Sequence, residues 1–243
     1  MTIAIHAGRG LLEETYGGAA KTVIAGVEAV CDPTGALYLP QMRLLVVSDL
    51  HMEKGSSFAR RGMLLPPYDT GATLDTLAAV IARYDPATVI SLGDSFHDPE
   101  ASARLPALYA IRLRGLMAGR EWIWITGNHD PHRPVHLPGD VASELAVGPL
   151  VFRHEPRLVS APGEIAGHLH PAARIVRRGR SVRRSCFASD GERLIMPAFG
   201  AYTGALNVLD RAFHGIFAEE RLLAFMLGAN RVYPVARSVL FPG

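Results

Sequence analysis

The sequence predicts an α/β layered fold, in which a parallel sheet is followed by a more antiparallel one. Between residues 44 and 126, short apolar runs alternate with helical stretches, an order that implies parallel pairing. Polar residues directly follow these runs, where a parallel sheet places its ligand-binding groups. After residue 150 the chain shows short strand candidates separated by turn signals, which favours antiparallel pairing.

Length and composition indicate one globular domain. The chain has 243 residues, 49% of them hydrophobic and 20% charged, and no linker-like stretch divides it. We expect a Gly-rich, flexible loop over residues 1–20 and one domain over residues 21–243. The net charge of +2 is too small to imply nucleic-acid binding by itself.

Cysteine usage and hydropathy indicate the compartment. Cys31 and Cys186 form no C-x-x-C pair, which argues against a disulfide framework and a thiolate zinc site. The sequence lacks a signal-peptide pattern and any run of membrane-spanning length. We therefore expect a soluble, cytoplasmic protein without a membrane partner.

The first elements are predicted from strand propensity and turn chemistry. Residues 22–30 are β-branched enough to form one strand. Asp32-Pro33-Thr34-Gly35 has the composition of a type I turn, so residues 36–39 would be the returning strand. The apolar run that begins at Leu44 is predicted to be a buried strand.

Two helices and two further strands come next. Within residues 69–84 apolar side chains recur at helical spacing, at Leu74, Leu77, Ala78 and Ile81. Residues 101–117 are predicted to form a second helix, with Pro106 near its first turn and Leu105, Leu108 and Ile111 facing inward. The strands are expected over residues 88–92 and 122–126.

The second half of the chain is predicted to contain short strands. Arg178-Gly179 and Asp190-Gly191 are turn signals between them. The candidates are residues 150–152, 165–166, 174–176, 182–188 and 194–196, with 225–227 and 231–235 as closing strands.

The polar cluster that ends the first buried strand is Asp49-Leu50-His51. On an extended backbone residues two apart point the same way, so a carboxylate oxygen and an imidazole nitrogen would converge on one point. That donor set suits a divalent first-row metal. Similar clusters follow later strands: Gly93-Asp94, Gly127-Asn128-His129-Asp130, Arg153-His154-Glu155 and Gly167-His168-Leu169-His170.

Each cluster alone has an ordinary interpretation as a turn, a cap or a hydrogen-bonded histidine, but their fixed order after successive strands indicates a shared site. Glycine before a cluster lets the backbone turn sharply and approach a ligand closely. Together the clusters resemble the pattern D-x-H, G-D-x-x-D/H, G-N-H-D/E, H and G-H-x-H of the calcineurin-like metallophosphoesterase superfamily. The resemblance implies a four-layer α-β-β-α sandwich with two mixed sheets flanked by helices.

A narrower resemblance links the chain to the ligase-associated DNA damage response phosphoesterases. It rests on residues 48–62, 65–70 and 197–204, the last reading Pro-Ala-Phe-Gly-Ala-Tyr-Thr-Gly. The resemblance implies a metal-dependent phosphodiesterase, an endonuclease that acts on DNA in repair. It also implies a functional association with an ATP-dependent DNA ligase.

The resemblance further implies a site for two divalent metal ions. Asp49, His51 and His170 would hold one ion, Asn128, His154 and His168 would hold the other, and Asp94 would bridge them. A bridging carboxylate screens the repulsion between two such ions. Manganese is favoured by the resemblance, while iron, zinc or cobalt would fit the same imidazole, carboxylate and amide ligands.

Other residues are expected to support the chemistry. His129 would lie over the leaving-group oxygen and stabilise or protonate it, and Asp130 would orient or charge His129. His97 is expected to support a ligand from behind, with Asp98 as the alternative. Both also fit a helix N-terminus capped by Asp98.

Two basic segments have open interpretations. Lys54, Arg60 and Arg61 could contact substrate phosphates or lie on a solvated loop. Residues 171–184 contain six arginines and no acid, which fits either DNA-backbone binding or a soluble, protected sheet edge. No aromatic residue interrupts them, so base stacking is not indicated.

Three functions remain in competition. The first is the DNA phosphodiesterase, and the second is a phosphomonoesterase or small-molecule nucleotide phosphodiesterase of the same fold. The third is a non-catalytic binding module on a decayed site, which the intact set of clusters disfavours.

Overall fold

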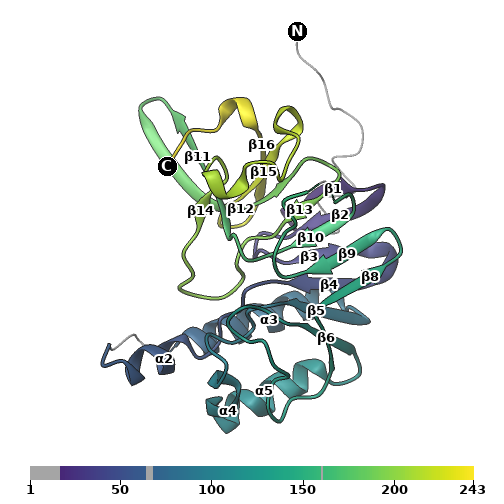
Figure 1. The fold of residues 1–243 in the computed structure, drawn as a ribbon, viewed down its shortest axis with the longest axis vertical. Helices are drawn as coiled ribbons and strands as arrows, with labels where there is room; N and C mark the ends of the chain where they lie inside the picture. The colour runs from purple at the N-terminus through teal and green to yellow at the C-terminus, as the bar shows by residue number, and fades with distance from the viewer. Residues whose placement is uncertain (1–16, 64–67, 160) are drawn as a thin grey trace.

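The computed structural model describes residues 17–63, 68–159 and 161–243. Two β-sheets pack face to face, and the α-helices lie on the outer side of the first sheet (Figure 1). Residues 1–16 of the loop predicted for residues 1–20 lie outside the described residues. Residues 65–67 of the narrower motif also lie outside them. Among the described residues, no helix has the length and apolar character that crossing a bilayer requires.

The first sheet has seven strands in sequence order and is mixed. Its first part is antiparallel and its second part, from β4 to β7, is parallel. The strands are β1 (Ala20–Ile24), β2 (Val27–Cys31), β3 (Leu37–Leu39), β4 (Leu44–Val47), β5 (Thr88–Leu92), β6 (Glu121–Ile125) and β7 (Asp140–Ala142). The predicted parallel pairing of the three buried strands is confirmed.

The start of the chain differs from the prediction of one strand over residues 22–30. The backbone turns at Ala25 and Gly26, which have φ of 46° and 83°, and β1 and β2 form a hairpin. Glycine adopts this left-handed region without a steric penalty, which lets a short turn interrupt the β-branched run. The next turn is confirmed, because the Gly35 N–H donates to the Asp32 carbonyl at 2.9 Å.

The helices are only partly as predicted. Helix α3 (Asp69–Tyr84) has the predicted bounds and buries Leu74, Leu77 and Ile81. The segment after His51, interpreted above as a possible loop, forms α2 (Lys54–Arg60).

The second predicted helix is broken into α4 (Ala101–Arg104) and α5 (Ala107–Met117). Pro106 precedes α5 and cannot continue the α4 hydrogen-bonding ladder, so α5 starts with a new phase. Leu108 and Ile111 are consequently 72% and 61% exposed, which corrects the inward face predicted for them, while Leu113 and Met117 are buried.

The second sheet is also mixed. β9, β10 and β13 pair in parallel, whereas the remaining long pairings are antiparallel, as predicted. Its strands are β8 (Glu144–Val147), β9 (Leu150–Arg153), β10 (Glu164–Ala166), β11 (Pro171–Arg177), β12 (Arg180–Ser189), β13 (Leu194–Ile195), β14 (Leu206–Asn207), β15 (Leu223–Leu227) and β16 (Val232–Ala236).

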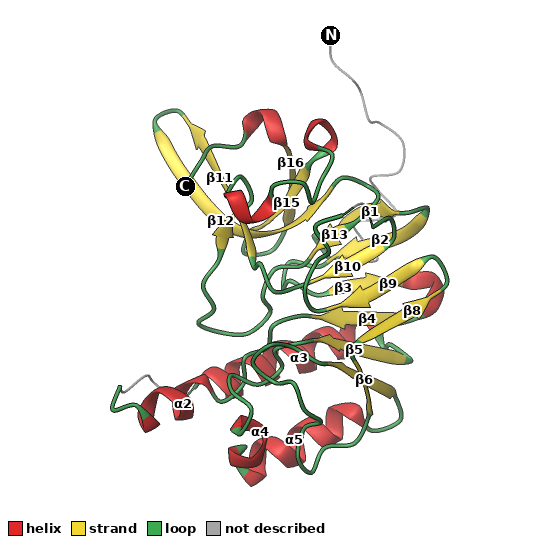
Figure 2. Ribbon diagram, in the orientation of Figure 1, coloured by secondary structure: helices red, strands yellow, loops and turns green. Residues whose placement is uncertain are grey.

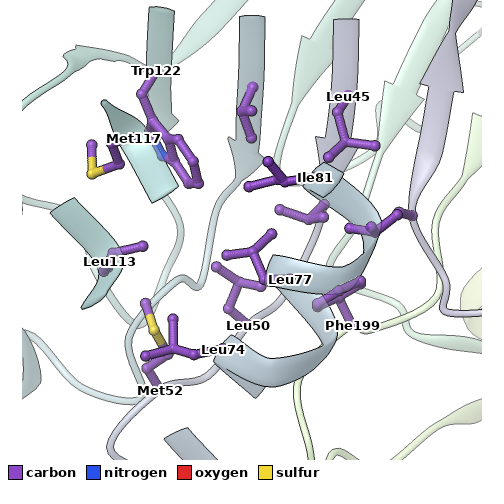
Figure 3. Packing of buried hydrophobic residues seen from close by; sticks show 14 of the residues in the cluster. Leu45, Leu50, Met52, Leu74, Leu77, Ile81, Leu113, Met117, Trp122 and Phe199 are labelled. Carbon is purple, nitrogen blue, oxygen red and sulfur yellow. The ribbon is translucent and has the colours of Figure 1, made fainter. Parts of the chain in front are cut away.

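Three apolar layers hold the sandwich together. Val46 and Ile90 from the first sheet pack against Phe152, Ile165 and Phe187 from the second. On the outer side of the first sheet, side chains of α3 and α5 pack over β4 and β6 (Figure 3).

The outer face of the second sheet is covered by short 3-10 helices and loops. Phe213, Phe217 and Leu222 supply the apolar contacts there, from η2 (Arg211–Phe213), η3 (Glu219–Arg221) and their flanks. The predicted α/β sandwich is confirmed. In Figure 2 the α-helices lie beside the first sheet, and the red segments near β15 and β16 are 3-10 helices.

Candidate metal centre

The predicted clusters meet at one place in the structure. Asp49, Asp94 and Asn128 follow β4, β5 and β6, and His154 and His168 follow β9 and β10 of the other sheet. The two sheets therefore contribute to one site. Its residues form three groups whose ligand atoms lie within 4.8 Å of one another: Asp49, His51 and His170; Asp94, His154 and His168; and His51, His97 and His129.

The first group joins residues far apart in the sequence. The Nε2 atom of His170 lies 3.1 Å from Oδ1 of Asp49, and the rings of His170 and His51 are 5.4 Å apart. Oδ2 of Asp49 accepts from the Ser48 hydroxyl at 2.5 Å and from the His168 N–H at 3.1 Å. One carboxylate oxygen of Asp49 is thus held by the protein while the other points toward the imidazoles.

The second group contains Asn128 as well. Its Oδ1 lies 3.0 Å from both Nε2 of His154 and Nδ1 of His168. Oδ2 of Asp94 lies 3.3 Å from Nε2 of His154 and 3.9 Å from Nε2 of His51. Asp94 therefore lies between the two groups.

The backbone at the site is not extended, contrary to the expectation for Asp49-Leu50-His51. Asp49 and His51 have φ of 54° and 41°, and positive values also occur at Asp94, His168 and His170. Non-glycine residues rarely adopt this region, and such residues cluster at functional sites. The side chains converge through these local turns rather than through strand geometry.

Three glycines permit this close packing, as predicted. A Cβ atom at Gly93 would lie 2.4 Å from Nδ1 of His154, and one at Gly127 would lie 2.1 Å from Oδ1 of Asp94. At Gly167 it would lie 2.0 Å from Oγ of Ser48. Any larger residue would displace a predicted ligand or its support.

The donor atoms fit a metal ion. Oδ1 of Asp49 and Nε2 of His170 are buried and lie 3.1 Å apart, and neither has another hydrogen-bond partner among the described residues. Buried polar atoms without a partner are rare in native proteins and call for a ligand. Carboxylate, imidazole and amide donors together suit divalent first-row ions.

Electrostatics favour positive charge between the carboxylates. Burial acts to raise the pKa of Asp94, but the hydrogen bond and charge of His154 outweigh it and hold the pKa at about 2. Burial acts to lower the pKa of His154, yet Asp94 and Asp49 raise it to about 9. Burial acts to raise the pKa of Asp49 as well, but the hydrogen bond and charge of His170 lower it. Both carboxylates therefore stay ionised and attract a cation.

A model of the calcineurin-like phosphoesterase family matches residues 42–180, which contain all of the predicted ligands. The chain belongs to the calcineurin-like phosphoesterase family. Enzymes of this family are metal-dependent hydrolases of phosphoesters, and the donor set described above is consistent with that chemistry.

Solved structures give further similarity. The crystal structure of Pseudomonas putida nuclease MPE superposes with a TM-score of 0.68 and 29% sequence identity, over 89% of this chain and 100% of that chain. Yfce, a phosphoesterase from E. coli, gives a TM-score of 0.40 and 17% identity, over 79% and 98% of the two chains. The curated proteins contain no match to this chain.

His129 lies at the open edge of the phosphoesterase site. Its side chain is 41% exposed, and its Nε2 is 4.0 Å from Oδ2 of Asp94. Its Nδ1 lies 2.9 Å from the His97 carbonyl, and the rings of His97 and His129 stack at 5.4 Å. His97 thus fixes the ring of His129 by contact, which supports a positioning role for His97.

Contrary to the prediction, the Asp130 carboxylate forms no hydrogen bond or ion pair with the His129 side chain. Its Oδ2 accepts the N–H groups of Ser95 and Phe96 at 2.8 and 3.2 Å, and its Oδ1 accepts that of Gly127 at 3.1 Å. Burial and the charge of Asp94 raise its pKa to about 7, against the opposing effect of these donors. Asp130 therefore joins the loops after β5 and β6, while the His129 ring contacts His97 instead.

We expect the Asp130→Ala variant to lose about 3 kcal/mol of unfolding free energy, because three buried N–H groups lose their acceptor. Asp130→Asn, which keeps an acceptor oxygen, should lose clearly less. Urea denaturation of the metal-free proteins measures both values. A stability of Asp130→Ala equal to that of the wild type would show that the two loops do not depend on this side chain.

The remaining predicted residues lie outside the ligand groups. Asp98 pairs with Arg104 at 2.5 Å and accepts the Glu100 N–H at 3.0 Å, so its carboxylate holds the turn that precedes α4. Arg60 pairs with Glu100 at 2.6 Å.

Lys54 and Arg61 were the other two predicted phosphate contacts. Nζ of Lys54 donates to the carbonyl of Tyr202 at 2.7 Å, which ties α2 to the 197–204 segment. Arg61 is exposed at the end of α2. Contact of either residue with a substrate remains a prediction.

Sequence reasoning missed the carbonyl groups that orient the ligands. Nδ1 of His154 lies 3.1 Å from the Leu92 carbonyl, and Nδ1 of His170 lies 3.1 Å from the Gly204 carbonyl. Such partners fix the ring orientation of metal-binding histidines. A backbone carbonyl has no residue-type signal, although the 197–204 motif did mark the segment that contains Gly204.

Proposed function

We propose that the protein is a phosphodiesterase that uses two divalent metal ions to cleave DNA, as an endonuclease associated with repair and ligation. The observation that carries the proposal is the position of Asp94 between two groups of donor side chains. One group is Asp49, His51 and His170, and the other is Asn128, His154 and His168.

These residues would hold the metals as the sequence predicted, with Asp94 shared between both. When bound, the ions would acidify a coordinated water and neutralise charge on the phosphoryl group. Manganese remains the favoured ion, and iron, zinc and cobalt fit the same donors.

The chain's own contribution to bond cleavage would come from His129. Its Nε2 faces the site, while its Nδ1 is engaged with the His97 carbonyl. With a proton on both ring nitrogens, Nδ1 would donate to the His97 carbonyl, and Nε2 would give its proton to the leaving oxygen as the bond from phosphorus to that oxygen breaks. The exposed edge of the ring gives a polymeric substrate access from solvent.

The choice of nucleic acid as substrate is supported by the similar nuclease from Pseudomonas putida. The link to repair and to an ATP-dependent ligase rests on the motif resemblance at residues 48–62 and 197–204. A cytoplasmic location fits the same role. The metal site itself would activate water equally for a diester or a monoester.

The test compares three substrates with metal-free protein reloaded with manganese: an aryl phosphodiester, an aryl phosphomonoester and a circular DNA. We expect turnover of the diester and cleavage of the DNA. Turnover of the monoester alone would replace the proposal with the phosphomonoesterase alternative. Absence of activity on all three would favour a binding module.

A further inference from the structure

The β11–β12 hairpin projects from the second sheet beyond its neighbours (Figure 1). We call residues 174–184 the arginine ribbon, since they contain all six arginines of the hairpin and no acid. β14 pairs only with Pro171 and Ala172, and β15 pairs only with Cys186–Ser189. Beyond residue 175 the ribbon is therefore two strands wide among the described residues.

The register places like charges opposite each other. Arg174 faces Arg183 and Arg177 faces Arg180 across the two strands. Like charges directly opposite in an antiparallel pair are destabilising. A two-stranded ribbon has little stability of its own, so this arrangement works against the fold.

Counter-charges do not relieve the repulsion. Most arginines elsewhere in the described chain pair with a carboxylate, for example Arg104 with Asp98 and Arg193 with Glu164. The side chains of Arg177, Arg178 and Arg180 have no hydrogen-bond or ion-pair partner among the described residues, and all three are exposed. The charge at the end of the ribbon is left for an external anion.

The base of the ribbon is held by carbonyl groups instead. Arg174 donates to the Pro242 carbonyl at 2.8 Å and Arg183 donates to the Ala205 carbonyl. Ala205 follows Gly204, whose carbonyl lies beside the ring of His170. The ribbon is thus fixed relative to the catalytic site at its base, and its end remains free.

We propose that the arginine ribbon binds the phosphate backbone of duplex DNA that continues from the bond being cleaved. The inference rests on the proposed function and extends it to the path of the substrate. Arginine donates two hydrogen bonds to one phosphate, and the absence of aromatic residues on the ribbon disfavours base stacking. A two-stranded ribbon is also narrow enough to follow a DNA groove.

The length of the ribbon sets the length of DNA that it reaches. From His170 to the turn at Gly179 the strand spans about 30 Å at about 3.3 Å per residue. Phosphates along one strand of a duplex are about 3.4 Å apart along the axis. A duplex that lies along the ribbon would therefore meet its end about eight to ten base pairs from the cleaved bond.

The main test is the triple variant Arg177→Ala, Arg178→Ala and Arg180→Ala, loaded with manganese. We expect at least about a 10-fold loss of kcat/KM on duplex DNA longer than about ten base pairs on each side of the cleaved bond. Hydrolysis of an aryl phosphodiester and cleavage of duplexes shorter than about six base pairs should be unchanged. The same substitutions with Lys keep the positive charge and should retain most of the activity on long DNA.

Binding provides a second readout. Both the wild-type ribbon and the triple Ala ribbon are placed in a His129→Ala background to prevent cleavage. Fluorescence anisotropy on a labelled long duplex should then show a shallower dependence of log affinity on log salt for the triple Ala ribbon. Each lost phosphate contact lowers that slope by about 0.9. The three substitutions should therefore lower it by about 2 to 3.

A matched control variant also loses three positive charges, but at arginines outside the ribbon that form surface ion pairs. The substitutions are Arg112→Ala, Arg221→Ala and Arg237→Ala. An equal loss of DNA binding in this control would overturn the inference. If the Ala variant binds and cleaves long DNA as well as the wild type does, the inference is also overturned. The same holds if the ribbon is found to bind anionic lipid vesicles instead of DNA. If the wild type cleaves neither DNA nor the aryl diester, the proposed function itself fails.

Discussion

The His129→Ala variant is expected to keep both metal ions and to lose about 100- to 10,000-fold in turnover of DNA and other diesters with poor leaving groups. That range is typical of removing one general acid. His129 lies at the open edge of the site with its ring fixed by His97, and its Nε2 is the atom available to a leaving oxygen. Steady-state kinetics and metal analysis by mass spectrometry provide the two measurements.

The leaving group and a neighbouring histidine provide the controls. An activated aryl diester needs little protonation, so the loss on that substrate should be much smaller. His132→Ala removes an exposed histidine three residues away and should behave as the wild type. Full activity of His129→Ala on a poor leaving group would eliminate the acid role. Loss of a metal ion would instead make His129 a ligand together with His51 and His97.

The Asp94→Ala variant is expected to fall from about two bound metal ions to one or fewer, and to lose turnover on every substrate. Asp94 is 2% exposed, and its Oδ2 faces His154 and His51, which belong to different ligand groups. A shared carboxylate screens the repulsion between two ions, so its removal makes joint occupancy unfavourable. Metal content after reloading and dialysis measures the effect directly.

Two further variants separate charge from structure. Oδ1 of Asp94 accepts the His129 N–H at 2.9 Å, a bond that Asp94→Asn can keep while removing the negative charge. We expect Asp94→Asn to lose metal as Asp94→Ala does, with a smaller loss of stability. Asp98→Ala removes a carboxylate four residues away that pairs with Arg104, and it should retain both ions. Unchanged stoichiometry in Asp94→Ala would exclude Asp94 as the bridge.

The sequence predicted which residues meet at the site better than how they meet. The strand ends before Asp49, Asp94 and Asn128 were found because apolar runs and the polar residues after them are local signals. The left-handed backbone at Asp49 and His51 was not predicted, because residue type alone does not reveal a positive φ outside glycine.

Two errors occurred where a distant contact decides the outcome, and one at a local break in a helix. The carboxylate of Asp130 binds backbone N–H groups of Ser95 and Phe96, which lie on another loop and have no sequence signature. The inward face of α5 was misplaced because Pro106 restarts the helix. The parallel pairing of β9, β10 and β13 depends on which short strands meet in space, which periodicity does not reveal.

The convergence of both sheets on one site has a consequence for how the protein folds. Oδ1 of Asp49 and Nε2 of His170 lie 3.1 Å apart in the structure, although about half of the 243-residue chain separates the two residues in the sequence. Contacts between such distant positions require loop closure and form slowly relative to local helices and hairpins. The complete ligand set therefore exists only after the two sheets have docked. During refolding, tight metal uptake would therefore mark the docking of the two sheets. Neither half of the chain contains all of the ligands that two metal ions would need.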